Sequence, residues 1–224
     1  MTVGVLLAAG ASRRMGTNKA LVRTGGQSFL VRGLCQLWSA CDAVIVVLGS
    51  NAPRVRKVIE AEFERLVAGS KLHKNLKRAH GAAGFEARFV VNRGWRRGMF
   101  SSARLGLATA LSLDAEAILV LPVDHPGVSP ETVRALATAM GQALGAFGRP
   151  AGRRRLAFAY ALVPRYRRRR GHPIALSPAL AAAIVVDRGA ANLSDAVRRS
   201  ARLVGYLDCA DSGVVRNVNA PSRR

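Results

Sequence analysis

The sequence predicts an α/β protein with a mostly parallel sheet. Short apolar runs rich in β-branched residues alternate with segments whose apolar residues recur at helical spacing, and half of the 224 residues are hydrophobic. Such alternation is typical of βαβ units, in which helices cover both faces of a parallel sheet. Since a chain of this length and hydrophobicity can bury a sizeable core, and shows no internal repeat or linker, we expect a single domain over residues 1–224.

Each expected element follows from a local pattern. Apolar runs that stop at glycine or polar turns predict strands at residues 3–7, 43–48, 87–91, 117–123, 156–163 and 173–176, with short late strands at 202–207 and 214–218. Helical spacing predicts helices at residues 29–37, 53–67, 100–111, 178–185 and 192–199, and another from residue 130. Ser28 and Ser129 are expected to cap their helices, and Pro53 suits a first helical turn. Residues 145–152 are expected to form a loop.

Residues 69–84 are basic, poor in large apolar side chains and bounded by glycines, so we expect an exposed insertion, helical or disordered. The formal net charge of +22 attracts polyanions, whether nucleic acid, anionic lipid or a phosphorylated substrate. The three cysteines include no CxxC pair, which argues against a disulfide framework or a cysteine-rich zinc site. No apolar run is long enough to span a membrane and no basic signal region precedes one, so a cytoplasmic protein is expected.

The segment LAAGASRRMGTNKAL, residues 7–21, follows the first expected strand. Its small residues let the backbone approach a ligand closely, and consecutive N–H groups in such a turn can hold an anion. Arg13, Arg14 and Lys19 add positive charge where a triphosphate would lie. The segment matches neither GxxxxGK[ST] nor GxGxxG. Phosphate binding is favoured over the alternative, an ordinary strand-to-helix loop with solvated arginines.

Parallel sheets bind ligands at the carboxyl ends of their strands, which singles out the loops after Leu7, Leu48, Val91 and Val123. Asp124 follows a buried strand, where an unpaired carboxylate is costly, and its oxygens suit Mg²⁺. The alternative is that Asp124 caps a turn before a proline. His125 is interpreted as a loop residue, because no second His or Cys stands at ligand spacing.

Residues 92–106 read NRGWRRGMFSSARLG. Gly98 permits close backbone approach before a helix, and Ser101 and Ser102 stand at the N-terminus of that helix, where N–H groups favour anions. The alternative is an N-cap serine and a core tryptophan, Trp95. His172, in the run RRGHPI, is either an acceptor contact or a structural histidine before proline.

LAAG-x-S-x-R-M-G-x-x-K-x-L, over residues 7–21, resembles the signature of the MobA-like nucleotidyltransferases, the family that includes molybdenum-cofactor guanylyl- and cytidylyltransferases. The stretches at 92–106, 122–126, 170–173 and 217–221 are similar to further motifs of that family. The resemblance implies a single Rossmann-like, three-layer α/β/α domain with a mostly parallel twisted sheet, as in nucleotide-diphospho-sugar transferases. It also implies transfer of a nucleoside monophosphate from an NTP to a phosphorylated acceptor, with release of pyrophosphate and dependence on Mg²⁺.

The resemblance also assigns roles to residues. Together with the charge of Arg13 and the position of Gly49 directly after an expected strand, it predicts nucleotide binding by Leu7, Ala8, Ala9, Gly10, Ser12, Arg13, Arg14, Lys19, Gly49, Asn92, Gly98 and Ser102. Arg14, Lys19 and Asp124 are the expected catalytic residues, Asp124 and Asn219 the expected metal ligands, and Ser101 and His172 the expected acceptor contacts. The form LAAG, with Ala9, is similar to the cytidylyltransferase branch and favours CTP, with molybdopterin as acceptor.

Two alternatives remain open at this point. One is a nucleotidyltransferase for another phosphorylated acceptor, such as a sugar phosphate or phospholactate. The other is a non-enzymatic basic module that binds nucleic acid. The second is disfavoured because aromatic residues make up 5% of the chain and show no stacking pattern, and no helix-turn-helix, zinc-finger or RNP pattern occurs. The sequence does not fix the oligomeric state.

Overall fold

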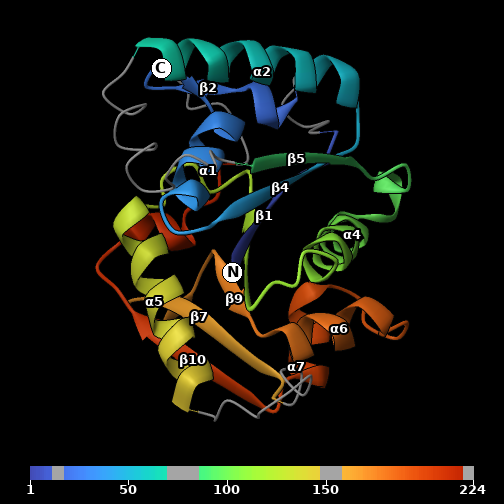
Figure 1. Cartoon of the computed structure of the whole chain (residues 1–224), viewed down its shortest axis with the longest axis vertical. Helices are drawn as coiled ribbons and strands as arrows, with labels where there is room; N and C mark the ends of the chain where they lie inside the picture. The colour runs from blue at the N-terminus through green and yellow to red at the C-terminus, as the bar shows by residue number, and fades with distance from the viewer. Residues whose placement is uncertain (12–17, 70–85, 147–157, 219–224) are drawn as a thin grey trace.

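The computed structural model describes residues 1–11, 18–69, 86–146 and 158–218. Its main sheet has the strand order β10–β7–β9–β6–β1–β4–β5, with β8 paired to β7 (Figure 1). The strands are β1 (Thr2–Ala8), β4 (Ala43–Leu48), β5 (Glu86–Val91), β6 (Ala117–Pro122), β7 (Tyr160–Tyr166), β8 (Arg169–Arg170), β9 (Ile174–Leu176) and β10 (Leu203–Asp208). β6, β1, β4 and β5 are parallel neighbours, and β10 is parallel to β7. β9 runs antiparallel between β6 and β7, so the prediction of a mostly parallel sheet is confirmed.

Helices cover both faces of this sheet and complete three layers (Figure 1). One face carries α1 (Phe29–Trp38), α2 (Ala52–Gly69) and α5 (Pro130–Ala146). The other carries α4 (Met99–Leu111), α6 (Pro178–Val186) and α7 (Leu193–Ser200). Short 3₁₀ helices η2 (Lys19–Leu21), η4 (Trp95–Arg97) and η5 (Ser212–Val215), and a small hairpin of β2 (Arg23–Thr24) and β3 (Gln27–Ser28), occupy connections between them.

The central strand β1 shows why the sequence reads as continuous apolar runs. Leu6 and Ala8 pack in the hydrophobic cluster beneath α1 and α5, whereas Val5 and Leu7 pack in the cluster beneath α4 and α6. Neighbouring residues of a strand point to opposite faces, so a strand covered on both sides must be apolar at every position. All residues of β4 and β6 are buried for the same reason.

Both predicted helix caps are confirmed. Ser28 Oγ accepts a hydrogen bond from Val31 N at 3.3 Å, and Ser129 Oγ accepts one from Thr132 N at 3.1 Å. These contacts satisfy amides that have no partner within the first turn of a helix.

The prediction of a strand at residues 214–218 is wrong, because residues 212–215 form η5. The side chain of Asp211 stabilises this turn. Its Oδ1 accepts a hydrogen bond from Gly213 N at 2.8 Å, and its Oδ2 accepts one from Ser129 N at 2.8 Å. A short carboxylate that binds nearby amides favours a turn over an extended chain.

Several boundaries also differ from the prediction. Strand β7 begins at Tyr160 and runs to Tyr166, and α5 continues through residues 145–146, which were expected to be loop. The short pairings β2–β3 and β7–β8 were not predicted. Gly69 ends α2, and the rest of the expected insertion at 69–84 lies outside the described residues. In the described part of the chain, no helix combines the length and apolarity needed to cross a membrane.

Candidate active site

Loops that follow four parallel strands meet at one edge of the sheet. Val123 N donates to the Leu7 carbonyl at 3.0 Å, Ser50 N donates to the Ala9 carbonyl at 3.1 Å, and Asn92 N donates to the Leu48 carbonyl at 2.8 Å. These bonds link the carboxyl ends of the four strands across the edge, in the spatial order β6, β1, β4 and β5. This is where ligands of parallel α/β sheets bind, and where the sequence predicts the site.

Lys19 and Asp124 form an ion pair at this edge. Lys19 Nζ lies 3.4 Å from Asp124 Oδ2, and the two side chains are 16% and 23% exposed. Partial shielding from water makes their attraction stronger than that of a fully exposed pair. The structure thus brings together two of the three predicted catalytic residues; the third, Arg14, lies outside the described residues.

Asn18, which the sequence analysis missed, fixes the turn that carries Lys19. Its Oδ1 accepts from Ala20 N at 3.0 Å, and its Nδ2 donates to the Ser50 carbonyl at 3.3 Å. The side chain therefore caps η2 and ties it to the loop after β4. An asparagine directly before a short apolar turn is the signal that would have found it, because asparagine is among the preferred N-cap residues.

The glycine-rich loop after β1 passes very close to the loop after β4. A Cβ atom built on Gly49 would lie 2.5 Å from the Ala9 carbonyl oxygen and 2.7 Å from Trp95 Cβ. Glycine at position 49 is therefore required by this approach. Ala9 is itself buried, as are Leu7 and Ala8, so these three can offer a ligand little beyond backbone groups.

Gly10 and Gly98 differ from Gly49. Gly10 is exposed, and a Cβ atom on it would meet no described residue within 4 Å. Gly98 has a φ of +97°, a conformation that L side chains rarely adopt, directly before α4 begins. Position 49 therefore requires glycine because a larger side chain has no space, whereas position 98 favours glycine because of its backbone conformation.

Asn92, Ser101 and Ser102 hydrogen-bond to one another. Asn92 Nδ2 donates to Ser101 Oγ at 2.8 Å and to Ser102 Oγ at 2.9 Å, and Asn92 Oδ1 accepts from Gly94 N at 2.9 Å. Asn92 is 5% and Ser102 1% exposed, so these two contacts fasten the end of β5 to the first turn of α4. The predicted ligand contacts of the three residues stay predictions. Trp95 packs partly buried against the core, with the guanidinium of Arg96 4.9 Å from its ring centroid.

His125 and His172 lie against each other beside Asp124, with their ring planes tilted by 47°. Their ring centroids lie 4.7 Å apart, and His125 Nε2 is 3.9 Å from Asp124 Oδ1. Burial lowers the pKa of His172 to about 4, with a further lowering by His125 that Asp124 opposes. Burial also lowers the pKa of His125, against the opposite effects of Asp124 and of a hydrogen bond with the Gly213 backbone. Both rings are therefore neutral at neutral pH, and His125 is a buried loop residue rather than a solvated one.

The remaining predicted site residues, Ser12, Arg13 and Asn219, lie outside the described residues, as Arg14 does. The chain just before Asn219 does run beside Asp124, because Val218 N donates to the Asp124 carbonyl at 2.8 Å. Among the described residues, no group of three His, Cys, Asp or Glu side chains is arranged to hold a metal ion.

Comparison with known proteins identifies the family of the chain. The model of the MobA-like NTP transferase domain matches residues 4–203. No curated protein matches the sequence.

Solved structures share the fold. Rv0371c from Mycobacterium tuberculosis H37Rv is 23% identical, with a TM-score of 0.66 over 99% of this chain and 94% of its own. The structure of its complex with manganese is 22% identical, with a TM-score of 0.58 over 93% of this chain and 88% of its own. A nucleotidyl transferase from Methanothermobacter (Mth528) is 20% identical, with a TM-score of 0.66 over 99% and 93%. Molybdopterin-guanine dinucleotide biosynthesis protein A from Archaeoglobus fulgidus is 18% identical, with a TM-score of 0.58 over 99% and 93%.

The family match covers most of the chain, and the parallel edge with its Lys19–Asp124 pair is where such an enzyme is expected to bind its substrates. The alternative of a non-enzymatic nucleic-acid-binding module is therefore set aside. The chain belongs to the MobA-like NTP transferase family: it is a nucleotidyltransferase with the three-layer α/β/α fold of the nucleotide-diphospho-sugar transferases.

Proposed function

We propose that the protein transfers cytidine monophosphate from CTP to a phosphorylated acceptor, molybdopterin, with release of pyrophosphate and with Mg²⁺ as cofactor. The observation that carries this proposal is the Lys19–Asp124 pair, which joins the phosphate-binding loop after β1 to the carboxylate after β6. We further propose that residues 1–224 form one catalytic domain, supported by the family match over residues 4–203 and by the shared main sheet.

The proposed reaction needs positioning more than acid–base chemistry. An oxygen of the acceptor phosphate attacks the α-phosphorus of CTP, the bond from that phosphorus to the oxygen bridging to the β-phosphate breaks, and pyrophosphate leaves with the electron pair. The attacking oxygen is already ionised, so no base is required. Lys19 and Arg14 would hold the phosphates in line and offset the charge that develops on the leaving pyrophosphate.

The residues at the edge fit a magnesium ion of the kind that accompanies nucleotides. Mg²⁺ retains several waters and is usually held by one or two protein oxygens together with substrate phosphates, so a cluster of three side chains is not needed. Asp124, 23% exposed at the edge, offers carboxylate oxygens, and Asn219 follows the Val218 amide that is bonded to the Asp124 carbonyl. When bound, the ion would neutralise negative charge on the phosphate oxygens. The manganese in the Rv0371c complex supports a divalent cation in this fold.

The preference for CTP rests on Ala9, through the resemblance of LAAG to the cytidylyltransferase branch. Ala9 is buried beside Gly49, and its carbonyl accepts from Ser50 N, so the residue at this position shapes the backbone beneath the nucleotide rather than presenting a functional group.

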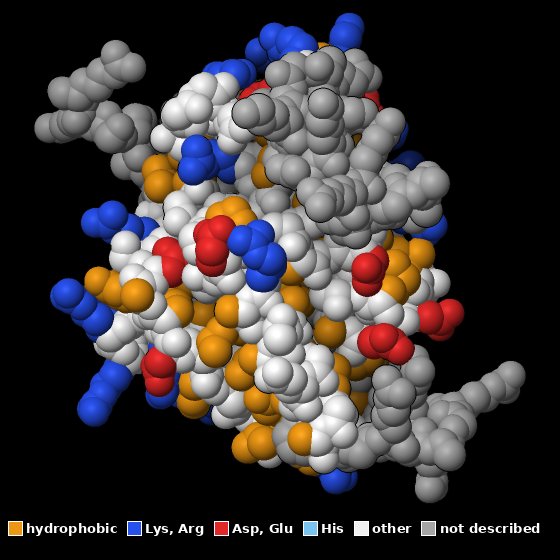
Figure 2. Space-filling model, turned by 60° about the vertical axis from the view of Figure 1, so that its left-hand side comes forward, with side chains coloured by type: hydrophobic (Ala, Val, Ile, Leu, Met, Phe, Trp, Pro, Cys, Tyr) orange, Lys and Arg blue, Asp and Glu red, His pale blue; other side chains and the backbone are white. Residues whose placement is uncertain are grey.

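The acceptor is proposed to bind on the side of Ser101 and His172. A neutral His172 can hydrogen-bond a polar acceptor without adding charge. The net charge of +22 suits a phosphorylated molecule. On the face that Figure 2 displays, the described basic side chains lie at several separate points.

The test is a matrix of pyrophosphate-release assays in which CTP, GTP, ATP and UTP, each with Mg²⁺, are combined with molybdopterin, a sugar 1-phosphate or phospholactate. We expect turnover with CTP and molybdopterin. Turnover with GTP alone would overturn the base preference. Turnover with a sugar phosphate but not with molybdopterin would overturn the acceptor.

A further inference from the structure

The segment around η5, residues 209–218, lies against two of the loops that build the candidate active site. Val218 N donates to the Asp124 carbonyl at 2.8 Å, and His172 N donates to the Val214 carbonyl at 2.9 Å. The η5 segment is therefore bonded to the loop after β6, which carries the proposed metal ligand. It is also bonded to the connection between β8 and β9, which carries a proposed acceptor contact.

Two glycines let the η5 segment pack tightly against these loops. A Cβ atom built on Gly213 would overlap the Gly127 carbonyl oxygen, and one built on Gly171 would overlap the Val214 carbonyl oxygen. Glycine is therefore required at both places. Since groups packed this closely transmit a displacement to one another, a movement of η5 has to move the loop after β6 and the backbone next to His172.

The carboxylate of Asp211 fixes the position of η5. Its Oδ1 accepts from Gly213 N at 2.8 Å within the turn, and its Oδ2 accepts from Ser129 N at 2.8 Å at the start of α5. Hydrogen bonds to an ionised carboxylate are about twice as strong as those between neutral groups. Asp211 thus fastens η5 to the residue at which the loop after β6 ends and α5 begins.

Helix α1 holds the middle of the same loop from the other side. The buried side chain of Gln36 donates through Nε2 to the Pro126 carbonyl at 3.0 Å and to the Val128 carbonyl at 2.7 Å. The first residue of the loop, Asp124, is bonded through its carbonyl to Val218 of the η5 segment. The position of Asp124 therefore depends on where η5 lies.

We propose that Asp211 is a positioning residue of the transfer reaction. By holding η5 against the start of α5, it sets where Asp124 meets the metal ion and where His172 meets the acceptor. The carboxylate acts through the backbone of residues 213–218 rather than by contact with a substrate. The roles of Asp124 and His172 in this inference rest on the proposed function.

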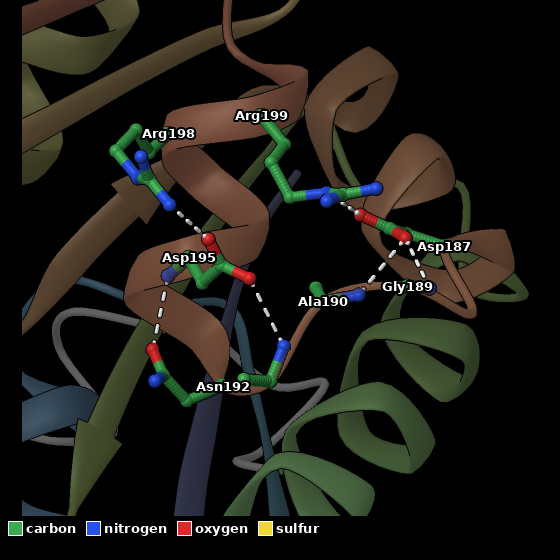
Figure 3. A network of polar contacts seen from close by, with 8 residues as sticks. Asp187, Gly189, Ala190, Asn192, Asp195, Arg198 and Arg199 are labelled. Carbon is green, nitrogen blue, oxygen red and sulfur yellow. Dashed lines mark hydrogen bonds and ion pairs between the residues drawn. The ribbon is translucent and has the colours of Figure 1, made fainter.

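Asp187 offers a matched control, because its carboxylate makes the same kind of contact elsewhere (Figure 3). Its Oδ1 accepts from Gly189 N at 2.8 Å and from Ala190 N at 3.2 Å, and its Oδ2 pairs with Arg199 at 3.2 Å. The loop it stabilises joins α6 to α7 and contains none of the predicted site residues. Asp187→Asn and Asp211→Asn therefore each weaken the backbone contacts of one loop carboxylate with little change in side-chain volume.

The first test is amide hydrogen exchange, read by NMR on the ¹⁵N-labelled protein without nucleotide. Asp211→Asn replaces one accepting oxygen by a nitrogen that cannot accept, so we expect the His172 and Val218 amides to exchange at least about fivefold faster. The Ser50 amide, bonded to the Ala9 carbonyl at the same edge, should change less than about twofold.

Asp187→Asn should leave all three amides within about twofold of wild type. Unchanged rates at His172 and Val218 in Asp211→Asn would overturn the inference. Equal acceleration of the Ser50 amide, or equal acceleration in Asp187→Asn, would also overturn it, because the effect would then be a general loss of stability.

The second test is a titration with Mg²⁺ at saturating CTP, followed by the thermal shift. Asp211→Asn should raise the Mg²⁺ concentration for half-maximal stabilisation at least about fivefold, and Asp187→Asn should change it less than about twofold. A merely structural role predicts a lower melting temperature with an unchanged Mg²⁺ midpoint, and that result would refute positioning of Asp124. If the wild-type protein shows no response to CTP with Mg²⁺, the proposed function fails, and the exchange rates alone decide whether Asp211 positions the two loops.

Discussion

Lys19 Nζ and Asp124 Oδ2 lie 3.4 Å apart although 105 residues separate them in the sequence. The pair exists because β1 and β6 are parallel neighbours, so the loops after them leave the sheet at the same edge. It places a cation that suits phosphate beside a carboxylate that suits a divalent metal.

Replacing either partner should weaken nucleotide binding without unfolding the protein. Asp124→Asn is expected to abolish the Mg²⁺-dependent part of the thermal stabilisation by CTP, because it removes the charge of the proposed metal ligand. Lys19→Met is expected to lower CTP affinity at least about tenfold, because it removes a positive charge proposed to bind phosphate. Turnover should fall at least about a hundredfold in both. Lys57→Met, on the exposed face of α2, is the control for lost charge. Cation-dependent stabilisation that persists in Asp124→Asn would exclude Asp124 as the metal ligand.

Acid should destabilise the protein through His172. The pKa of His172 is about 4 in the folded chain, below its ordinary value of 6.5, because the ring is buried. As pH falls below 6.5 the unfolded state gains a proton that the folded state takes up only near pH 4, so the free energy of unfolding falls between these values. The upper limit is about 3.5 kcal/mol, from about 1.4 kcal/mol for each pH unit between 6.5 and about 4. Urea unfolding at pH 7 and pH 4.5 should show a larger loss for wild type than for His172→Asn; equal losses would refute the assignment.

Gly49→Ala should displace the loop after β1, which Gly49 approaches closely. The added methyl would lie 2.5 Å from the Ala9 carbonyl oxygen and 2.7 Å from Trp95 Cβ, so the loops after β1 and β5 must move apart. We expect a loss of about 1–3 kcal/mol in the free energy of unfolding and weaker CTP binding. Gly141→Ala is the matched control: it is helical with open space around it and should stabilise the protein by up to about 1 kcal/mol. Unchanged CTP affinity in Gly49→Ala would show that this contact does not shape the site.

Asn92→Ala should destabilise the protein more than a surface substitution does. It removes two side-chain bonds to serine hydroxyls and one from the Gly94 amide at a buried position, so we expect a loss of about 2–4 kcal/mol in denaturant unfolding. Arg93→Ala, at the exposed neighbouring position, is the control. Normal stability combined with lost CTP binding would instead make Asn92 a direct nucleotide ligand.

Much of the fold could be predicted from the sequence because its signals are local. Continuous apolar runs identified β1, β4 and β6, and serine and proline marked the starts of α1, α2 and α5. The η5 turn was missed because the carboxylate of Asp211 outweighs the β propensity of two valines. The two-residue strands β2, β3 and β8 carry too few residues to show a periodicity.

The sequence by itself determined that a basic loop of small residues follows the first strand and that a carboxylate follows a later one, since each signal is contained within a few consecutive residues. The tertiary structure alone decided that Lys19 meets Asp124 and that the ring of His125 lies against that of His172. It also decided that Asp211 fastens η5 to the start of α5. These contacts depend on the order of the strands and on how the helices pack against the sheet. Both arise from the burial of apolar surface along the whole chain, so no short stretch of sequence predicts them.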